Sequence, residues 1–205
     1  MNLATFDLEK SFTRPVIGID EAGRGPWAGP VVTAGVMFKT YEDLPNWVWQ
    51  LNDSKKVSAI RRRDLFKKMI SCDTFLTFHI AVIDVMTIDR LNILEATMEG
   101  MRECIEVLRV NQEIVLVDGN RKPVLEDWCC PVIKGDSISL SIAAASILAK
   151  VYRDDLMAEL AKTYPEYGWE RNAGYGTADH QRALKQHGAT NHHRKSFAPI
   201  RELGV

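Results

Sequence analysis

Residues 139–164 constrain the fold of this chain more than any other segment. Their sequence, SLSIAAASILAKVYRDDLMAELAKTY, predicts one long helix, which Pro165 ends. Its alanines and serines are small, so the helix backbone can approach a neighbouring layer closely. We therefore expect this helix to pack against a β-sheet.

Five short apolar segments supply the strands of that sheet. Residues 15–20 (PVIGID) and 30–38 (PVVTAGVMF) are joined by a glycine-rich connection and predict an antiparallel hairpin. Further strands are expected at 74–83, 113–120 and 129–136. The fourth segment, EIVLVDGN, ends in turn-forming residues.

Two other helices are predicted by their capping residues. Residues 58–70 follow Ser58, a plausible N-cap. Residues 178–187 lie between Thr177, which can cap the start of a helix, and Gly188, which can cap its end. Both segments therefore follow a residue type that caps the start of a helix.

Residues 91–110 predict a further helix from their apolar spacing. We expect a loop before it, which holds Asp84 and Asp89. Apolar residues at alternating intervals of four and three form one stripe on a helix, and here they are Leu94, Met98, Met101, Ile105 and Leu108. Together, the predicted strands and helices indicate a mixed α/β domain with a helical C-terminal portion.

The composition is that of a globular chain without a membrane segment. The 205 residues are 46% hydrophobic, enough for a continuous core. No stretch approaches the roughly 20 apolar residues that span a bilayer, and the N-terminal residues lack the apolar core of a signal peptide. We expect a cytoplasmic protein. The four cysteines have no zinc-ligand spacing and are expected to be reduced thiols.

The formal net charge is only −1, but the charges are unevenly placed. Residues 55–68 contain seven basic residues and one acid, and residues 182–201 contain five basic residues, three histidines and no acid. Such runs are usually solvated helix faces. They can also bind a polyanion, because local potential steers association.

Acidic residues end three of the predicted strands. Asp20 and Glu21 end the first, Asp118 the fourth and Asp136 the fifth. One acid after a strand is usually turn or cap chemistry, but functional residues gather at strand ends in α/β sheets. The four carboxylates can therefore share one site. If the strand stays extended, Asp20 and Glu21 point to opposite sides, so we expect it to bend or end there.

Four carboxylates packed together without a cation would repel one another and raise their pKa values. Mg²⁺ and Mn²⁺ prefer such hard oxygen ligands and relieve the repulsion. Two divalent ions about 4 Å apart can activate water and stabilise the leaving oxygen in phosphodiester hydrolysis. The pattern therefore indicates a metal-dependent nuclease.

The glycine-rich connection, AGRGPWAGP at 22–30, allows a rival interpretation as a dinucleotide-binding loop. Its third glycine comes one residue late, prolines interrupt the expected helix start, and acids precede it where a pyrophosphate needs positive potential. It also lacks the Gly-Lys-Ser/Thr of a P-loop. A Gly-Arg-Gly turn does let backbone approach a ligand closely while Arg24 contacts phosphate.

Several motifs together resemble bacterial ribonuclease HII, a type 2 ribonuclease H, in order over residues 14–203. They are IGIDEAGRGPWAGPVV, LNDSKK, VDGN, KGDSISLSIAAASILAKVYRD, GYGT and HRKSF. The related ribonuclease HIII lacks the Gly-Arg-Gly turn. The resemblance implies a ribonuclease-H-like mixed sheet flanked by helices, with residues 1–165 as the catalytic domain and 166–205 as a helical extension packed on it.

The resemblance also implies an activity. The enzyme would cleave RNA in RNA–DNA hybrids and nick 5′ of a single ribonucleotide in duplex DNA, during DNA replication and ribonucleotide excision repair. It would use Mg²⁺ or Mn²⁺, with two ions during catalysis. The expected partners are these nucleic acids and no membrane; a monomer is expected, and a contact with a replication clamp cannot be read from the sequence.

Residue roles follow from the same resemblance. The metal-binding catalytic residues would be Asp20, Glu21, Asp118 and Asp136. The turn of Gly23, Arg24 and Gly25 would sense the ribose 2′-OH, which distinguishes RNA from DNA. Tyr175 would pack on the sugar of the neighbouring deoxynucleotide, and Ser54 and Lys55 would contact phosphates. The basic runs then become contacts to the duplex backbone.

The sequence leaves some residues without a role and allows alternative functions. Trp27 stands where the family pattern has a smaller aliphatic residue, and His193 and Arg194 have no assigned role. The alternatives are another carboxylate and metal enzyme, such as a DNA nuclease or an integrase-like phosphotransferase, and a catalytically silent nucleic-acid-binding module. A DNA nuclease has no use for a 2′-OH sensor, and a silent module has no use for the four acids.

Overall fold

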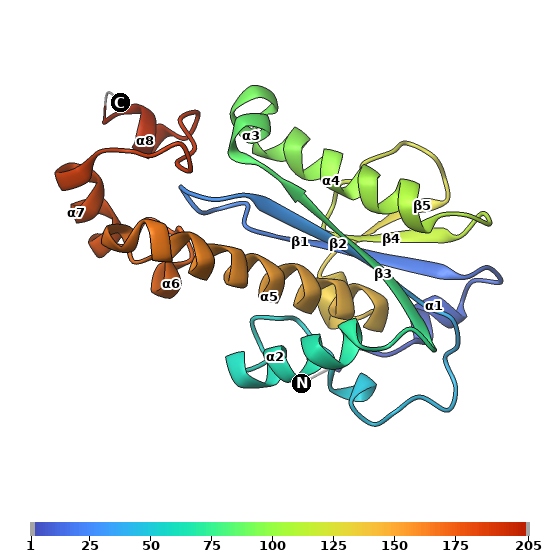
Figure 1. Ribbon diagram of the computed structural model, residues 1–205. Coiled ribbons are helices and arrows are strands. Elements are labelled where there is room, and N and C mark those ends of the chain that lie inside the picture. The colour runs from blue at the N-terminus through green and yellow to red at the C-terminus, as the bar shows by residue number, and fades with distance from the viewer. Residues whose placement is uncertain (1–2, 204–205) are drawn as a thin grey trace.

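The computed structural model describes residues 3–203 and is built on a five-stranded mixed sheet with the order β3-β2-β1-β4-β5. β1 pairs antiparallel with β2, which pairs antiparallel with β3, while β4 runs parallel to β1 and β5 parallel to β4. The predicted opening hairpin and mixed α/β class are confirmed (Figure 1). The strands are β1 Val16–Ala22, β2 Val31–Phe38, β3 Leu76–Ile83, β4 Ile114–Asp118 and β5 Cys129–Val132.

Helices cover both faces of the sheet (Figure 1). The long helix α5, Leu140–Thr163, lies against one face together with α2, Ala59–Ile70, and α4, Ile93–Leu108, covers the other. Gly18 explains the close approach of α5, because a Cβ on Gly18 would lie 2.3 Å from the backbone nitrogen of Ile142. The sheet-packed helix expected at 139–164 is confirmed.

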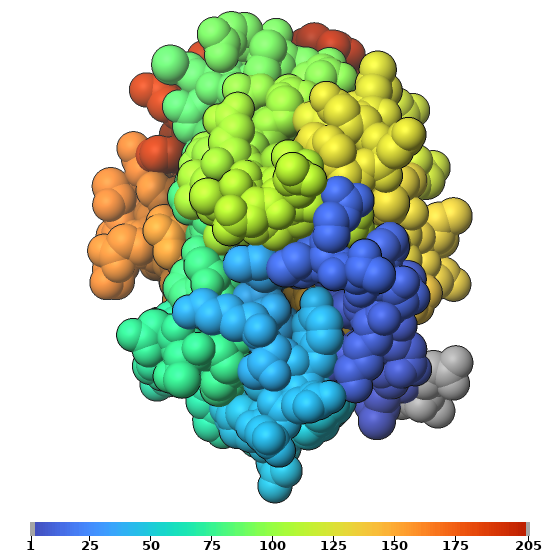
Figure 2. Space-filling view, turned by 90° about the vertical axis from the view of Figure 1, so that its right-hand side faces the viewer, coloured from blue at the N-terminus to red at the C-terminus, as the bar shows by residue number. Residues whose placement is uncertain are grey.

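The C-terminal helices extend beyond the end of α5 and lie at the left of Figure 1. Their apolar side chains pack with Ala28, Met157 and Ala161 in a cluster separate from those that cover the sheet. Figure 2 looks onto the opposite end of the molecule, which is formed in part by N-terminal residues (dark blue). The remaining helices are α1 Asp7–Lys10, α3 Val85–Leu91, α6 Trp169–Asn172, α7 Ala178–His187 and α8 Ala198–Arg201, with the 3₁₀ turns η1 Val48–Gln50, η2 Gly135–Ser137 and η3 Pro165–Tyr167.

Three predicted elements differ from the structure. Asp84 and Asp89 do not lie in a loop, because Asp84 caps α3 by accepting a hydrogen bond from the Thr87 amide, and Asp89 lies within that helix. The strand expected at 129–136 ends at Val132, since Lys134 adopts a left-handed conformation with φ 57°. β1 continues through Glu21 to Ala22, paired with β2 throughout, so it neither ends nor bends away at Asp20.

All four cysteines are free thiols, as predicted. Within residues 3–203, none of the helices combines the length and apolar character that a bilayer crossing requires. β1 and β4 run parallel and end at the same edge of the sheet, beside α5.

Candidate active site

The parallel pairing of β1 and β4 brings two of the predicted acids together. Gly18 is paired with Leu116 and Ile19 with Val117, so Asp20 and Asp118 follow at the same level on neighbouring strands. Side chains alternate along a strand, and both residues therefore point toward α5. Asp20 is only 5% exposed beneath that helix.

Glu21 and Asp136 reach the same region from other directions. Glu21 alternates to the face opposite Asp20, but the end of the sheet lets both line one cavity. Asp136 lies in η2, after the left-handed Lys134, and its backbone amide donates to Asp118 Oδ1 at 3.4 Å. The four predicted carboxylates therefore do lie in one region. Glu21 reaches it at the end of the sheet, and Asp136 is placed there by a 3₁₀ turn and not by the end of a strand.

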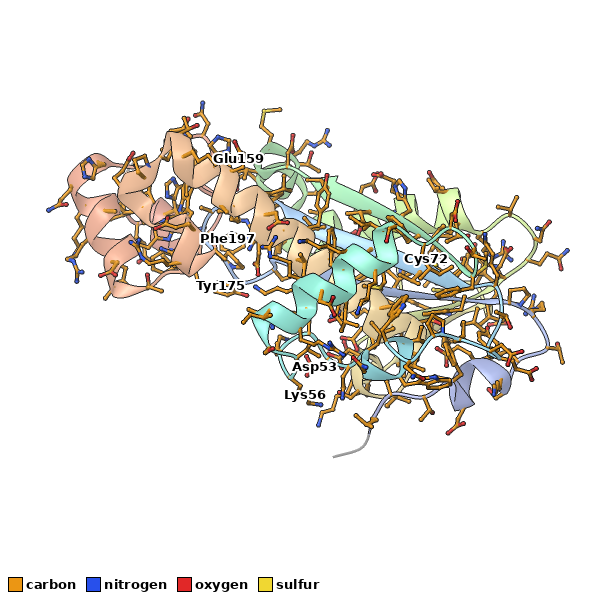
Figure 3. All side chains as sticks on the ribbon, turned by 60° about the horizontal axis from the view of Figure 1, so that its bottom comes forward. Asp53, Lys56, Cys72, Glu159, Tyr175 and Phe197 are labelled. Carbon is orange, nitrogen blue, oxygen red and sulfur yellow. The ribbon has the colours of Figure 1, made fainter. Side chains whose placement is uncertain are left out.

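The cavity has a volume of about 710 Å³ and is lined by all of the predicted site residues. Its wall comes from β1, β4, η2, α5, the glycine turn and the loop before α2. Figure 3 labels Tyr175 near the C-terminal helices, and Asp53 and Lys56 on the loop before α2. Predicted residues in the wall are Asp20, Glu21, Gly23, Arg24, Gly25, Ser54, Lys55, Asp118, Asp136 and Tyr175.

Burial and mutual repulsion dominate the electrostatics of the acids. Burial raises the pKa of Asp20 well above its usual range, and the neighbouring Glu21 and Asp118 raise it further. Burial also raises the pKa of Asp136 to about 6, with Asp118 and Asp53 adding to the effect. The pKa of Glu21 is raised by burial and partly lowered again by Arg24. The site therefore concentrates negative charge that the protein neutralises only in part, through Arg24 and Lys55 beside Glu21.

The donor set fits a hard divalent cation. Four carboxylates face one cavity, and a bound cation would remove the repulsion that raises their pKa values. Within residues 3–203, no three His, Cys, Asp or Glu side chains already form a closed ligand group. Glu21 Oε1 accepts a hydrogen bond from Arg24 Nη1 at 3.2 Å, and its other carboxylate oxygen, Oε2, makes no hydrogen bond within the described residues.

The Gly-Arg-Gly turn runs directly from β1 along the cavity wall. Gly23 has φ +99°, which favours glycine, and a Cβ there would lie 2.0 Å from Arg153 Nε. Among the described residues, the backbone N–H groups of Arg24 and Gly25 have no protein acceptor. The turn therefore combines close backbone approach with free hydrogen-bond donors.

Tyr175 lies beside this turn and is held by its own loop. A Cβ on Gly25 would lie 3.4 Å from the Tyr175 ring, which is 46% exposed. The Tyr175 carbonyl accepts hydrogen bonds from the Thr177 amide at 2.8 Å and from His180 Nδ1 at 3.0 Å. A ring that is half exposed and fixed at its backbone is available for contact with a ligand.

Trp27 links the turn to the Tyr175 loop. A Cβ on Gly176 would lie 2.2 Å from the Trp27 ring, and the Trp27 amide donates to the Gly174 carbonyl at 2.8 Å. The larger residue thus fills space beneath the loop, against the His180 ring at 6.0 Å. Its place in the glycine connection is a packing role that the sequence did not reveal.

The α5 helix contributes three cavity residues that were not predicted: Ser146, Lys150 and Arg153. Ser146 donates to Ser54 Oγ at 3.0 Å. Lys150 pairs with Asp154 at 2.8 Å. They lie on one face of α5 at intervals of four and three, a periodicity that pointed to them once α5 was placed on the sheet.

The two basic runs are less free than the sequence suggested. In the first run, Arg63 pairs with Asp155 at 2.6 Å, and Lys68 pairs with Asp64 at 2.9 Å. In the second, His193 and Arg194 are fully buried, so the prediction that this whole run contacts a duplex is wrong for these two residues. They cannot reach a nucleic-acid backbone from the interior.

Comparison with known proteins agrees with this geometry. The family model described as Ribonuclease HII matches residues 17–200. Ribonuclease HII of Rhodospirillum rubrum is 50% identical over 95% of this chain and 89% of its own. The ribonuclease HII in a complex with PCNA from Archaeoglobus fulgidus is 26% identical, with a TM-score of 0.71 over 88% of this chain and 93% of its own.

A third comparison supports the fold alone. Bst-RNase HIII, solved in complex with Mn²⁺, is 16% identical, with a TM-score of 0.72 over 93% of this chain and 69% of its own. The predicted ribonuclease-H-like sheet with a helical C-terminal region is confirmed. Match and site together lead to one assignment: the chain belongs to the ribonuclease HII family and is a ribonuclease H, a metal-dependent endoribonuclease.

Proposed function

We propose that this ribonuclease H cleaves the RNA strand of RNA–DNA hybrids and nicks duplex DNA on the 5′ side of a single ribonucleotide. One observation carries the proposal: the four carboxylates, the Gly-Arg-Gly turn and Tyr175 line the same cavity of about 710 Å³. A nuclease for DNA alone would have no use for a 2′-OH sensor beside its acids. The cavity therefore joins ribose recognition to hydrolysis.

In this proposal, the catalytic carboxylates are Asp20, Glu21, Asp118 and Asp136. They would hold Mg²⁺ or Mn²⁺, with two ions bound during catalysis. When bound, the ions supply electrophilic stabilisation of the phosphate and an activated water. The Mn²⁺ in the Bst-RNase HIII complex supports the choice of a hard cation. Asp20 and Asp118 are fixed by paired strands. Glu21 can offer its second carboxylate oxygen to a cation while Arg24, which is half exposed, contacts phosphate.

The sensor roles follow from position. The free amides of Arg24 and Gly25 can hydrogen-bond the 2′-OH or the scissile phosphate, while Gly23 keeps the turn close to the acids. The Tyr175 ring, beside Gly25, can pack on the sugar of the next deoxynucleotide. Ser54 and Lys55 complete the cavity wall and can contact phosphates. Lys55 is the more direct contact, because Ser54 is buried and hydrogen-bonded to Ser146.

We also propose the organisation and setting of the enzyme. Residues 1–165 form the catalytic domain and 166–205 an extension packed on it, as the separate apolar cluster around Trp169 supports. The enzyme works as a monomer in the cytoplasm. Because the Archaeoglobus fulgidus relative was solved with PCNA, a sliding clamp is a partner to test by co-elution.

The decisive experiment compares three labelled duplexes in Mg²⁺ and in Mn²⁺: one with a single embedded ribonucleotide, one RNA–DNA hybrid, and one all-DNA. We expect a nick 5′ of the ribonucleotide, cleavage of the hybrid and survival of the DNA. Equal cutting of the ribonucleotide duplex and the all-DNA duplex would contradict ribose recognition. Binding of all three without cutting would favour a catalytically silent module.

A further inference from the structure

Two arginines of this protein are buried without an acidic partner. Arg194 is 0% exposed and Arg153 is 1% exposed. Among residues 3–203, neither forms an ion pair with Asp or Glu. Burying an unpaired charge is costly unless every polar atom is satisfied. The burial of two such arginines near the cavity therefore suggests that they have a specific role.

All hydrogen-bond donors of the Arg194 guanidinium bind the glycine turn. A guanidinium has five N–H donors in a fixed fork, and each of them meets a different backbone carbonyl. Nε donates to Gly29 at 2.9 Å, Nη1 to Arg24 at 3.1 Å and Pro26 at 2.8 Å, and Nη2 to Gly23 at 2.6 Å and Pro30 at 3.1 Å. The turn from 23 to 30 is thus wrapped around one side chain.

This arrangement decides which backbone groups face the cavity. The carbonyls of Gly23 and Arg24 are directed inward to the guanidinium. The N–H groups of Arg24 and Gly25 are left without an acceptor among the described residues. A turn that points its carbonyls at a buried cation presents its amides outward, where a ribose hydroxyl or a phosphate can accept from them.

Arg153 joins the same turn to the Tyr175 loop. Its Nε donates to Pro30 at 2.9 Å, its Nη2 to Ala28 at 3.0 Å, and its Nη1 to Ala173 at 2.9 Å. Ala173 lies two residues before Tyr175 in a left-handed conformation. The spacing between the Gly-Arg-Gly amides and the Tyr175 ring is therefore set by bonds that do not involve the ligand.

The segment that carries Arg194 is itself anchored from α3. Asp89 accepts hydrogen bonds from the Lys195 amide at 3.0 Å, the Ser196 amide at 2.9 Å and the Ser196 hydroxyl at 2.6 Å. Asp89 is only partly buried and does not line the cavity of the acids. It offers a way to loosen Arg194 without removing a buried charge.

We propose that Arg194 is a positioning residue for ribonucleotide selectivity: its five carbonyl contacts hold the Gly-Arg-Gly turn in the shape that offers its amides to a ribose. This inference rests on the proposed function. Lysine in its place keeps the charge but replaces the planar fork by a point donor with at most three bonds. A turn with the wrong shape loses discrimination between ribose and deoxyribose, whereas contacts with the duplex backbone outside it persist.

The test is Arg194→Lys in an Asp118→Asn background, so that the nucleic acid survives the binding measurement. Affinity is measured for a duplex with one embedded ribonucleotide and for the same duplex in all-DNA form. We expect the ratio of the two dissociation constants to fall at least fivefold, through loss of affinity for the ribonucleotide duplex alone. Arg201→Lys, the same change at an exposed position of α8, serves as the matched control.

A second measurement does not depend on activity. Backbone amide exchange of peptides covering 23–30 and 172–177 should accelerate at least tenfold in Arg194→Lys and stay unchanged in Arg201→Lys. An equal loss of affinity for both duplexes would reveal a merely structural role and overturn the inference, as would unchanged exchange with an unchanged ratio. If Arg194→Lys does not fold, Asp89→Ala decides by the same two criteria.

Failure of the proposed function gives a different result. A parent protein that binds both duplexes equally, and a wild-type protein that does not cut at a ribonucleotide, would refute ribose sensing whatever Arg194 does. A wild-type protein that discriminates, together with an Arg194→Lys variant that discriminates equally well, would refute only the role of Arg194.

Discussion

The cavity is built from two regions that handle charge in opposite ways. At the strand ends, Asp20 and Asp136 sit among other acids, and burial with mutual repulsion raises their pKa values. In the glycine turn, the buried cation of Arg194 has every donor matched by a carbonyl. These two acids thus lack a partner for their charge, whereas the hydrogen-bond donors of Arg194 are all satisfied by the turn.

Metal binding and ribose recognition are thus assigned to regions with different degrees of preorganisation. A cation bound by the carboxylates relieves the repulsion that raises their pKa values. The turn is prepared before any ligand arrives, so little ordering cost remains when a ribose is bound. Metal binding is therefore expected to change the acidic region and to leave the turn nearly unchanged.

The largest expected effect comes from removing one acid. Asp118→Asn should lower the single-turnover cleavage rate at an embedded ribonucleotide by roughly a thousandfold, since metal stabilisation of the transition state supplies several kcal/mol. Binding of the RNA–DNA hybrid should persist. Asp127→Asn, an exposed acid in the loop before β5, is the matched control. A near-normal rate in Asp118→Asn would remove this residue from the metal site.

A second test disturbs the prepared region and leaves the acids intact. Gly23→Ala forces a left-handed alanine and a clash with Arg153 Nε at 2.0 Å, and a displacement of about 1 Å at a catalytic site costs about a hundredfold in rate. Gly188→Ala carries similar backbone strain at φ +76°, with nothing within 4 Å of the new Cβ. It should keep the wild-type rate. Equal rates in both variants would mean that the turn tolerates displacement.

The Tyr175 ring should have a smaller effect that depends on the substrate. Tyr175→Ala should lower cleavage at a single embedded ribonucleotide roughly fivefold, corresponding to one aromatic contact of about 1 kcal/mol. Cleavage within a continuous hybrid, where no deoxynucleotide follows, should change less. Tyr175→Phe keeps the ring and is the internal control. Equal losses on both substrates would argue against recognition of an RNA–DNA junction.

The smallest expected effect is on stability without metal. Because the folded-state pKa of Asp136 is raised to about 6, its contribution is favourable below about pH 4 and is lost as pH rises through 6. Asp136→Asn should therefore raise the melting temperature of the metal-free protein by roughly 2 °C at pH 8. At pH 4 the gain should disappear. Destabilisation at pH 8 would mean that repulsion does not dominate this region.

Much of the fold could be predicted because local patterns and tertiary structure agree. The apolar periodicity of 91–110 and the caps at Ser58 and Thr177 produce helices where they were expected. The predicted element boundaries are wrong where the backbone conformation of a single residue ends a strand or a helix. Left-handed Lys134 ends β5 early, and Asn92 at φ 72° separates α3 from α4 within what looked like a loop and one helix.

The chemistry of this protein can be predicted from residue types at fixed spacing: the four acids, the Gly-Arg-Gly turn and the order of the family motifs. The roles of Arg194, Arg153 and Trp27 depend on long-range packing. In a linear sequence Arg194 belongs to a basic run, and nothing local distinguishes it from an exposed arginine. Its burial and its five carbonyl partners arise from segments more than 160 residues apart, and long-range packing of that kind leaves no periodic trace.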